Sequence, residues 1–373
     1  MSSGEEPMPL LSLFSGPGGL DLGFERAGFR AMLALDVDSA TVETYNLNRW
    51  ARPVAEEADL SETTPLSIIA RWRQSAGDCV RPVGIIGGPP CQAFSVSNVR
   101  KFREDPRARL PLAYARILDA FNREFDLEFF VFENVAGLGH RPHASSLELF
   151  VAEFAKAGFD VRTFYLDAVN FGVPQYRNRL FIVGFNNTRY DASQFTPPAE
   201  KGRYRTVRET IGHLPEPVFF SRNLTRADIR PHPNHWCMNP KSLKFRNGAL
   251  RAGEMLGRSF RMLEWDTPSW TVAYGHREVH VHPSGHRRLS VYEAMLLQGF
   301  PVDYELRGSL SDQIRLVSDA VPPPLAFALA SAVREFIASR AHVCANRHAG
   351  ATGQTGQLGF LGLQTASPRS TRE

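Results

Sequence analysis

The stretch LLSLFSGPGGLDLGF, residues 10–24, joins an apolar run to a glycine-rich turn and then to the first residues of a helix. Residues 10–14 predict a short buried strand, and the turn after them has the shape of a nucleotide-binding loop. Its glycine spacing, G-x-G-G, differs from the dinucleotide fingerprint G-x-G-x-x-G, so taken alone it is weak evidence for a bound cofactor.

The next apolar run, residues 31–35, predicts a second strand that ends at Asp36, and Asp38 after it can cap a helix that runs through Tyr45. An acidic side chain in this place can accept hydrogen bonds from ribose hydroxyls. The turn and Asp36 together therefore predict half of a doubly wound α/β sheet that holds an adenosine-type ligand. Asp59, which follows a further short segment, could meet an adenine amino group or could be a plain helix cap, and the sequence favours neither.

A third apolar run, residues 83–86, is followed by GGPPCQAFS, residues 87–95. The glycines allow a tight turn and the prolines block a helix, so Cys91 is predicted at the carboxyl end of a strand, where open α/β sheets bind ligands. A free cysteine is more often an inert apolar residue, but this context favours a nucleophile. A neighbouring strand is predicted at residues 128–132 and ends at Glu133, which places thiol and carboxyl on the same rim of a parallel sheet.

Two further segments are rich in cations. Residues 97–110 contain Arg100, Lys101, Arg103, Arg107 and Arg109, which predict either a lid that closes on a polyanion or an ordinary solvated face. Residues 175–184 predict an edge strand, and by strand alternation its two arginines, at 177 and 179, point to one face.

The composition is that of a globular chain long enough for a large α/β domain and a second module: 373 residues, 43% hydrophobic and 22% charged. No secretory leader and no run of about 18 apolar residues is present, so we expect a cytoplasmic protein without a membrane span. The net charge is +4, and the preference for arginine over lysine leans towards nucleic acid.

The cysteines, at positions 79, 91, 237 and 344, are too widely spaced for a disulfide framework or a cysteine-built zinc site. Histidines at 232, 235, 276, 280, 282 and 286 lie around Cys237 but lack a second ligand pair at finger-like spacing. We therefore expect no metal.

The periodicity of residues 8–184 predicts one domain, which a helix within residues 315–339 completes. Residues 185–314 predict a smaller, loop-rich domain, in which a helix over 289–298 begins with a capping box of Ser290 and Glu293 and ends at Gly299. Residues 340–373 have no apolar period and are expected to be largely disordered.

In this order, the pieces resemble the DNA (cytosine-5) methyltransferases of the bacterial type, over residues 10–339. The family's motifs are present as FSGPGG at 14–19, GPPCQ at 88–92, ENV at 133–135, QYRNR at 175–179, RLS at 288–290 with Glu293 and QGFP at 298–301, and AVP at 320–322. The chain departs from the family at Asp36, where many relatives have Glu, at Val37, where an aromatic residue often covers the adenine, and at Ser318-Asp319, where Gly-Asn is usual.

The resemblance implies a Rossmann-like methyltransferase sheet that uses S-adenosyl-L-methionine, with a smaller, loop-rich target-recognition domain. It implies that Cys91 attacks C6 of a flipped cytosine, that Glu133 binds N3 and the exocyclic amine, that Arg179 steadies the O2 side and that Arg177 supports the surroundings of the thiol. The implied cofactor-binding residues are Phe14, Gly16, Gly18, Gly19, Leu20, Asp36, Val37, Asp59, Pro89, Leu110, Ala320 and Val321. The implied DNA-binding residues are Gln92, Ser95, Arg100, Lys101, Arg103, Thr271, Tyr274, Gly275, His276, Arg277 and Glu278.

The partner expected from the resemblance is double-stranded DNA, bound by a monomer, and a cognate restriction endonuclease would act as a separate protein. Three alternatives stay open: a relative that methylates RNA with the same thiol chemistry, a catalytically inert DNA-binding relative, and a nicotinamide dehydrogenase. The intact Pro90-Cys91-Gln92 and Glu133 disfavour the second, and the glycine spacing disfavours the third.

Overall fold

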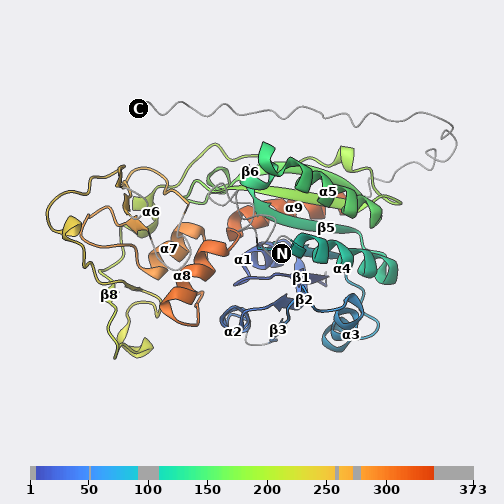
Figure 1. Cartoon of the computed structure of the whole chain (residues 1–373), viewed down its shortest axis with the longest axis horizontal. Helices are drawn as coiled ribbons and strands as arrows, with labels where there is room; N and C mark the ends of the chain where they lie inside the picture. Colours follow the sequence, from blue (N-terminus) through green and yellow to red (C-terminus); the bar gives the residue numbers. More distant parts are fainter. Residues whose placement is uncertain (1–5, 50–51, 91–108, 257–259, 272–278, 340–373) are drawn as a thin grey trace.

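The computed structural model describes residues 6–49, 52–90, 109–256, 260–271 and 279–339. Figure 1 shows two lobes: a twisted sheet covered by helices on both faces, and a loop-rich lobe that contains α6, α7 and α8. The first lobe contains a seven-stranded sheet in the order β3-β2-β1-β4-β5-β7-β6. Its strands are β1 (Met8–Leu13), β2 (Phe29–Asp36), β3 (Ala55–Glu57), β4 (Gly84–Gly87), β5 (Phe129–Val135), β6 (Phe159–Asp167) and β7 (Asn178–Asn186).

Strands β1 to β5 are parallel, and β7 runs antiparallel to both of its neighbours. The order of strands reverses between β1 and β4, so the carboxyl ends of these two strands form the topological switch point where sheets of this type bind ligands. The predicted α/β class with a doubly wound sheet is confirmed.

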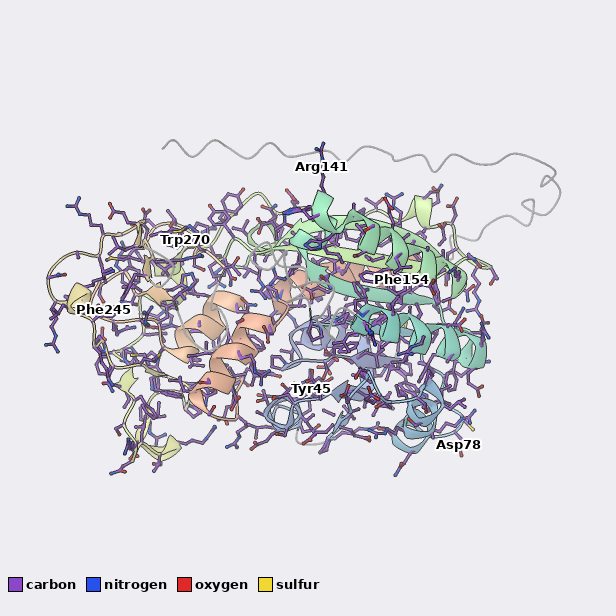
Figure 2. All side chains as sticks on the ribbon, viewed as in Figure 1. Tyr45, Asp78, Arg141, Phe154, Phe245 and Trp270 are labelled. Atoms are coloured by element: carbon purple, nitrogen blue, oxygen red, sulfur yellow. The ribbon has the colours of Figure 1, made fainter. Side chains whose placement is uncertain are left out.

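Helices cover both faces of the sheet because its central strands are apolar on both sides. On β5, Phe130 and Phe132 join the core formed with α3 (Pro65–Ala76), α4 (Leu110–Phe125) and α5 (Ala144–Lys156), whereas Phe129 and Val131 face α1 (Gly19–Arg26) and α9 (Pro323–Ala338). The labelled Phe154 lies over the first of these faces (Figure 2). Helix α2 (Ser39–Leu47) begins at Asp38, whose side chain accepts a hydrogen bond from the Thr41 amide as its predicted cap.

Two predictions about the sheet are wrong in detail. Strand β7 is not an edge strand, since β6 lies outside it, and it begins at Asn178, so Arg177 precedes it. Strand β5 starts at Phe129, one residue after the predicted start, and it ends at Val135, so Glu133 lies near its carboxyl end as expected.

The predicted domain boundary at residue 184 falls inside β7. The chain beyond it still packs on the first lobe, because the rings of Phe185, Tyr190 and Phe195 all contact Phe336 of α9. Helix α9 packs in the same core as α1, and the predicted domain bounds stay a prediction.

The second lobe is built around α7 (Val291–Gln298). All eight residues of this helix are buried. The predicted capping box of Ser290 and Glu293 is present, and Gly299 ends the helix with φ 86°. The other elements are α6 (Val207–Ile211), α8 (Leu310–Asp319), β8 (Val218–Phe219), β9 (Trp236–Cys237), β10 (Met255–Leu256), β11 (Phe260–Met262) and β12 (His280–Val281).

Helices α8 and α9 together form the stretch Leu310–Ala338, which is long and apolar enough to cross a membrane by length and composition alone. Of its most apolar window, 61% is buried inside the molecule. Leu316 and Val317 pack in the core of the second lobe, and Leu329 and Val333 pack in that of the first. The apolar character of this stretch is therefore accounted for by core packing.

Several hydrogen bonds join the two lobes beside the rim of the sheet. Asn48, after α2, exchanges two hydrogen bonds with the backbone of Glu305, at 2.8 and 2.9 Å. On the other side, the Ser269 amide donates to Pro174 O and the Tyr176 amide donates to Ser269 O. Thr271 Oγ1 adds a bond to Tyr176 O, at 2.8 Å.

Candidate active site

Glu133 and Arg179 form a buried ion pair at the carboxyl end of β5. Strand pairing sets Val135 opposite Arg179 and Phe181 opposite Glu133, so the two charged residues are diagonal neighbours on one face of the sheet. Arg179 Nε lies 2.8 Å from Glu133 Oε1, and their side chains are only 13% and 10% exposed. Burial raises the pKa of Glu133, although both Arg179 and Arg177 oppose that shift.

The glycine turn after β4 lies directly against this carboxyl. Gly87 pairs with Phe132 in the parallel ladder, which brings the following residue, Gly88, beside Glu133. A Cβ atom at Gly88 would lie 2.7 Å from Glu133 Oε2, so any other residue there would displace the carboxyl from its present position. The predicted shared rim of the third and fourth apolar runs is therefore confirmed up to Pro90, the last described residue before Cys91.

The Arg177 side chain binds the turn between α8 and α9, and its implied support of the thiol's surroundings stays a prediction, because Cys91 lies outside the described residues. Its side chain is 1% exposed, and its Nη2 donates to Ser318 O at 2.6 Å and to Ala320 O at 3.0 Å, in the turn between α8 and α9. Gln298 Nε2 donates to the same Ala320 O at 2.6 Å, and Gln175 Nε2 donates to Gln298 Oε1. These residues hold the wall of the rim, so Arg177 supports the Ala320 turn.

A cavity of about 30 Å³ lies at the switch point, between the glycine-rich turn and Glu133. Its walls are the ends of β1 and β4, the start of α1 and the turn before α9. It is lined by residues 14–17, 19–21, 87–88 and 319–321, with Ser12 and Glu133. Phe14, Gly16, Gly19, Leu20, Ala320 and Val321 of the implied cofactor site are thus brought together.

The turn itself is shaped for close approach. Gly16 has φ 55° with open space where a Cβ would be, and a Cβ on Gly19 would lie 2.2 Å from Val321 O. Gly18 faces α2 instead of the cavity, since a Cβ there would lie 2.9 Å from Arg49 Nη1. Asp36 accepts hydrogen bonds from the amides of Gly16 (3.0 Å) and Asp38 (3.1 Å), so its carboxylate holds the turn. Burial raises the pKa of Asp36.

The remaining implied cofactor residues do not line the cavity. Val37 is 65% exposed beside Asp36, and Leu110 is half-buried at the start of α4. Asp59 is exposed and accepts hydrogen bonds from Ser61, which lower its pKa. It closes a turn and is not the cap of α3, whose N-cap is Thr64. Pro89 is buried in the turn after β4.

Many of the predicted chemical residues lie outside the described ranges. These are Cys91, Gln92, Ser95, Arg100, Lys101 and Arg103, together with Tyr274, Gly275, His276, Arg277 and Glu278. Thr271, the last described residue before the second set, lies at the junction of the lobes.

Sequence reasoning missed four polar residues of the cavity: Ser12, Ser15, Asp21 and Asp319. For Asp21 the sequence offered a signal, namely an acidic residue among apolar ones in the first turn of a helix. The structure shows that Asp21 is 1% exposed, and acidic side chains are seldom buried without a specific partner.

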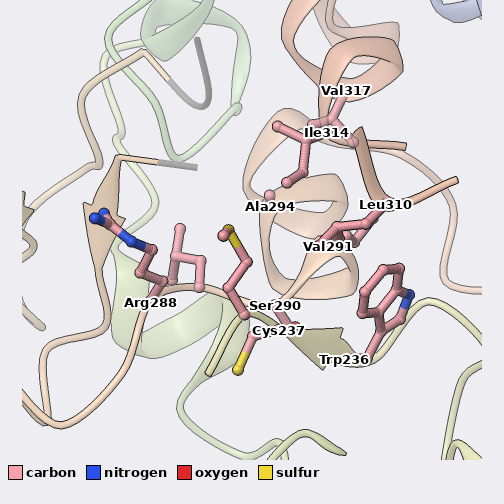
Figure 3. Close-up of a pocket in the computed structure, with 11 residues that line it drawn as sticks. Trp236, Cys237, Arg288, Ser290, Val291, Ala294, Leu310, Ile314 and Val317 are labelled. Atoms are coloured by element: carbon pink, nitrogen blue, oxygen red, sulfur yellow. The ribbon is translucent and has the colours of Figure 1, made fainter. Parts of the chain in front are cut away.

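The histidine-rich segment of the second lobe is used structurally. His235 bonds Ser290 Oγ and Pro215 O through its two ring nitrogens, and His232 stacks on Tyr292. Across the described ranges, no group of three or more His, Cys, Asp or Glu residues is arranged to hold a metal. A cavity of about 10 Å³ beside Cys237 has mainly apolar walls, and Arg288 extends away from it (Figure 3). It has room for at most one water molecule and is a packing gap.

Comparisons with known proteins agree on one family. The profile of the C-5 cytosine-specific DNA methylases matches residues 8–335. The Type II methyltransferase M.FnuDI of Fusobacterium nucleatum is 31% identical over 359 residues, covering 89% of this chain and 96% of that protein. M.MthTI of Methanothermobacter thermautotrophicus is 30% identical over 350 residues, covering 88% and 97%.

Solved structures share the fold at lower identity. A DNA modification methyltransferase encoded within an E. coli prophage has a TM-score of 0.70 at 22% identity, and covers 89% of this chain and 99% of that one. The Entamoeba histolytica methyltransferase EhMeth has a TM-score of 0.63 at 13% identity, with the same coverage.

Proposed function

Because this chain belongs to the C-5 cytosine-specific DNA methylase family, we propose that it transfers a methyl group from S-adenosyl-L-methionine to C5 of a flipped cytosine in duplex DNA. Membership of the family makes the chain a DNA cytosine methyltransferase. The donor, the residues that act and the form of the DNA are our proposal. The observation that carries it is the junction of Gly88, Glu133 and Arg179 on the wall of the glycine-lined cavity.

The residues at the switch point fit the proposed donor. The adenosine and methionine parts need a backbone that they can approach closely and a carboxylate for the ribose. Gly16 supplies the first and Asp36 the second, and the neighbouring Val37 is exposed to solvent. Both oxygens of Asp36 already accept amide hydrogens, but each carboxylate oxygen has a second lone pair for a hydroxyl. When bound, S-adenosyl-L-methionine supplies an electrophilic methyl group on a positively charged sulfur.

Glu133 is suited to bind the cytosine ring. Its raised pKa makes the protonated acid more accessible, and a protonated carboxyl can donate to N3 while it accepts from the exocyclic amine. Arg179, 2.8 Å away, keeps a positive charge beside the ring oxygen O2. Together they stabilise electron density that would otherwise build up on the ring during addition.

Cys91 is the proposed nucleophile, since it follows Gly88 by three residues in the sequence. Its thiolate forms a bond to C6, which makes C5 nucleophilic. C5 then takes the methyl group, and the sulfur that carried it becomes a neutral thioether. Loss of the C5 proton to solvent base and cleavage of the C6–S bond restore the aromatic ring and the thiolate.

The target base must leave the duplex, because neither face of its C5–C6 bond is accessible in a stacked helix. We propose that the second lobe positions the DNA, with the segment from Thr271 to Glu278 reading base edges and Gln92, Ser95, Arg100, Lys101 and Arg103 contacting DNA beside the flipped base. We further propose that the protein acts as a cytoplasmic monomer, with any cognate restriction endonuclease as a separate protein.

The thiol is tested with Cys91→Ser, and Cys79→Ser serves as the control because Cys79 is an exposed free cysteine. We expect Cys91→Ser to abolish transfer of tritiated methyl groups to duplex DNA, while Cys79→Ser matches the wild type. Wild-type protein should also form a denaturant-resistant adduct with duplex DNA that contains 5-fluorocytosine, because fluorine cannot leave C5 as a proton does.

Substantial turnover by Cys91→Ser would remove Cys91 from its role. Failure to trap an adduct on DNA that is otherwise methylated would contradict the covalent step. A parallel assay with transfer RNA distinguishes the RNA alternative, since we expect transfer to duplex DNA only.

A further inference from the structure

A tyrosine of the second lobe is bonded to the glycine-rich turn between β1 and α1. Tyr304, which follows α7 and is 3% exposed, donates a hydrogen bond from its hydroxyl to Pro17 O, 287 residues away in the sequence. Pro17 lines the cavity at the switch point together with Gly16 and Gly19, whereas Tyr304 is not among the described residues that line it. The second lobe therefore holds a wall of the cavity from its outer side.

The surroundings of the Tyr304 hydroxyl make it a donor. Burial raises the pKa of Tyr304 to about 12, although the nearby Arg49 opposes that shift, so the hydroxyl keeps its proton at neutral pH. The guanidinium of Arg49 has only donors, so it can approach only the lone pairs of this oxygen. Arg49 is itself held by Glu25 of α1, with N–O distances of 2.8 and 3.1 Å. The hydroxyl proton is thus directed to Pro17 O.

The segment that carries Tyr304 is anchored without this hydroxyl. Its next residue, Glu305, exchanges two hydrogen bonds with Asn48 of the first lobe, at 2.8 and 2.9 Å. The Tyr304 ring packs against Phe300, with ring centroids 5.0 Å apart. Loss of the hydroxyl alone should therefore leave the segment in place and remove only its bond to the turn.

The turn has the freedom that makes such a bond useful. Pro17 lies between two glycines with positive φ, Gly16 at 55° and Gly18 at 84°, and glycine adopts several backbone conformations at little cost. Asp36 of the first lobe holds the Gly16 amide at 3.0 Å. Tyr304 holds the carbonyl of the following residue, so the two lobes together select one conformation of the turn.

We propose that Tyr304 is a positioning residue for the methyl donor, which holds Pro17 so that the glycine-rich turn keeps the shape that binds the donor. The inference rests on the donor proposed above and adds that the second lobe completes its site. Tyr304 acts through Pro17 and does not touch the ligand. Its loss should therefore weaken donor binding without altering the groups that act on the base.

Tyr304→Phe removes the hydroxyl and keeps the ring, and Tyr292→Phe is its matched control. The Tyr292 hydroxyl donates to Val302 O at 3.0 Å, so it holds the same segment of the second lobe without contacting the turn. Calorimetry should show that Tyr304→Phe binds S-adenosylhomocysteine about 5-fold more weakly than the wild type, the effect of one neutral hydrogen bond. Tyr292→Phe should bind within about 2-fold of the wild type.

Steady-state kinetics with sheared duplex DNA adds a readout that a purely structural residue would not change. The KM for S-adenosyl-L-methionine should rise about 5-fold in Tyr304→Phe while kcat stays within about 2-fold, because the bond shapes the donor site and does not touch the reacting atoms. Denaturant unfolding should show similar losses of stability in both variants, since each loses one hydrogen bond.

Equal affinity of the wild type and Tyr304→Phe for S-adenosylhomocysteine would overturn the inference. Equal losses of affinity in Tyr304→Phe and Tyr292→Phe would also overturn it, because the segment would then act through its packing alone. A lower kcat with an unchanged KM would do the same. If the wild-type protein did not bind S-adenosylhomocysteine, the proposed donor itself would be wrong, and the role of Tyr304 with it.

Discussion

Asp21 is a buried acid whose ionisation opposes folding. Burial raises its pKa from 3.8 to about 6, so the folded protein holds this proton more tightly than the unfolded chain does. The stability it contributes is complete below pH about 4 and is lost as the pH rises towards 6. At neutral pH the ligand-free protein therefore carries a cost on the order of 3 kcal/mol at this site.

Asp21→Asn should accordingly stabilise the ligand-free protein at pH 7.5 and have a clearly smaller effect near pH 4.5. The reason is that the amide never ionises, so the difference in melting temperature from the wild type should shrink as the pH falls. Thermal unfolding of both proteins across this range checks it, with the exposed Asp266→Asn as the control. A variant less stable than the wild type at pH 7.5 would contradict the prediction.

Gly88 lets the turn after β4 lie close to the Glu133 carboxyl. A methyl group added at Gly88 would change the position of that carboxyl. We expect Gly88→Ala to displace the Glu133 carboxyl, because its Cβ would lie 2.7 Å from Oε2, and to lower kcat on the order of 10- to 100-fold. Thermal stability should change little, since the end of a side chain can move aside. Gly202→Ala is the matched control, because open space surrounds that position, and equal loss of turnover in both variants would exclude this explanation.

At the scale of elements, two segments donate hydrogen bonds to one backbone carbonyl. Arg177 before β7 and Gln298 at the end of α7 both donate to Ala320 O, in the turn that leads into α9. Gln175 fixes Gln298 in turn. Val321, next along the chain, is a wall of the cavity, so this cluster links the strand that carries Arg179 to the cofactor side of the site.

Arg177→Lys should keep the charge but lose Nη2, the single atom that donates to both Ser318 O and Ala320 O, because the lysine ammonium lies one bond closer to the backbone. We expect a destabilisation of about 1 to 3 kcal/mol and a weaker affinity for S-adenosylhomocysteine, on the order of 10-fold, because the Ala320–Val321 wall loosens. Calorimetry and denaturant unfolding measure the two effects. Arg208→Lys, at an exposed site, should show neither. If the affinity for S-adenosylhomocysteine and the stability were both unchanged, Arg177 would not be needed to hold the Ala320–Val321 wall of the cavity.

At the scale of the whole molecule, Glu133 and Arg179, proposed to act on the base, lie in the first lobe, and the segment proposed to read bases starts in the second. The Thr271 hydroxyl is bonded to Tyr176 O, one residue before Arg177, so the segment proposed to read bases starts at the rim. The second lobe has its own core, which includes Leu263, Leu289 and Leu297, and it lies beside the sheet (Figure 1). Changes in recognition should therefore leave the catalytic groups intact.

Arg277→Ala tests this separation. If Arg277 reads a guanine by a bidentate pair, its loss should cost on the order of 1 to 3 kcal/mol at the preferred site and relax one base position. Bisulfite sequencing of DNA from cells that express the variant would then show a motif degenerate at that position. The same motif at lower occupancy would mean that Arg277 contacts phosphate, and Arg222→Ala in the same lobe provides a comparison.

Short-range signals in the sequence determined much of this fold. The glycine turn at residues 16–19, the cap at Asp38, the capping box of Ser290 with Glu293 and the left-handed Gly299 each depend on residues within about one turn of one another, so the sequence contains the whole interaction. The order of apolar runs likewise predicted parallel strands with Gly88 and Glu133 on one rim. The resemblance to a family rested on these same local motifs.

Only the tertiary structure decided the rest. Arg177 donates hydrogen bonds to carbonyl oxygens that are 141 and 143 residues away in the sequence. Asp21 accepts a hydrogen bond from Tyr45, which lies 24 residues further along the chain in α2. No periodicity encodes such partners, because they depend on how helices and strands pack once hydrophobic burial has brought them together. For the same reason β7 is an inner strand, because β6 pairs with its outer edge. This pairing is set by burial of the apolar face of β6, and the local sequence pattern of β7 does not encode it.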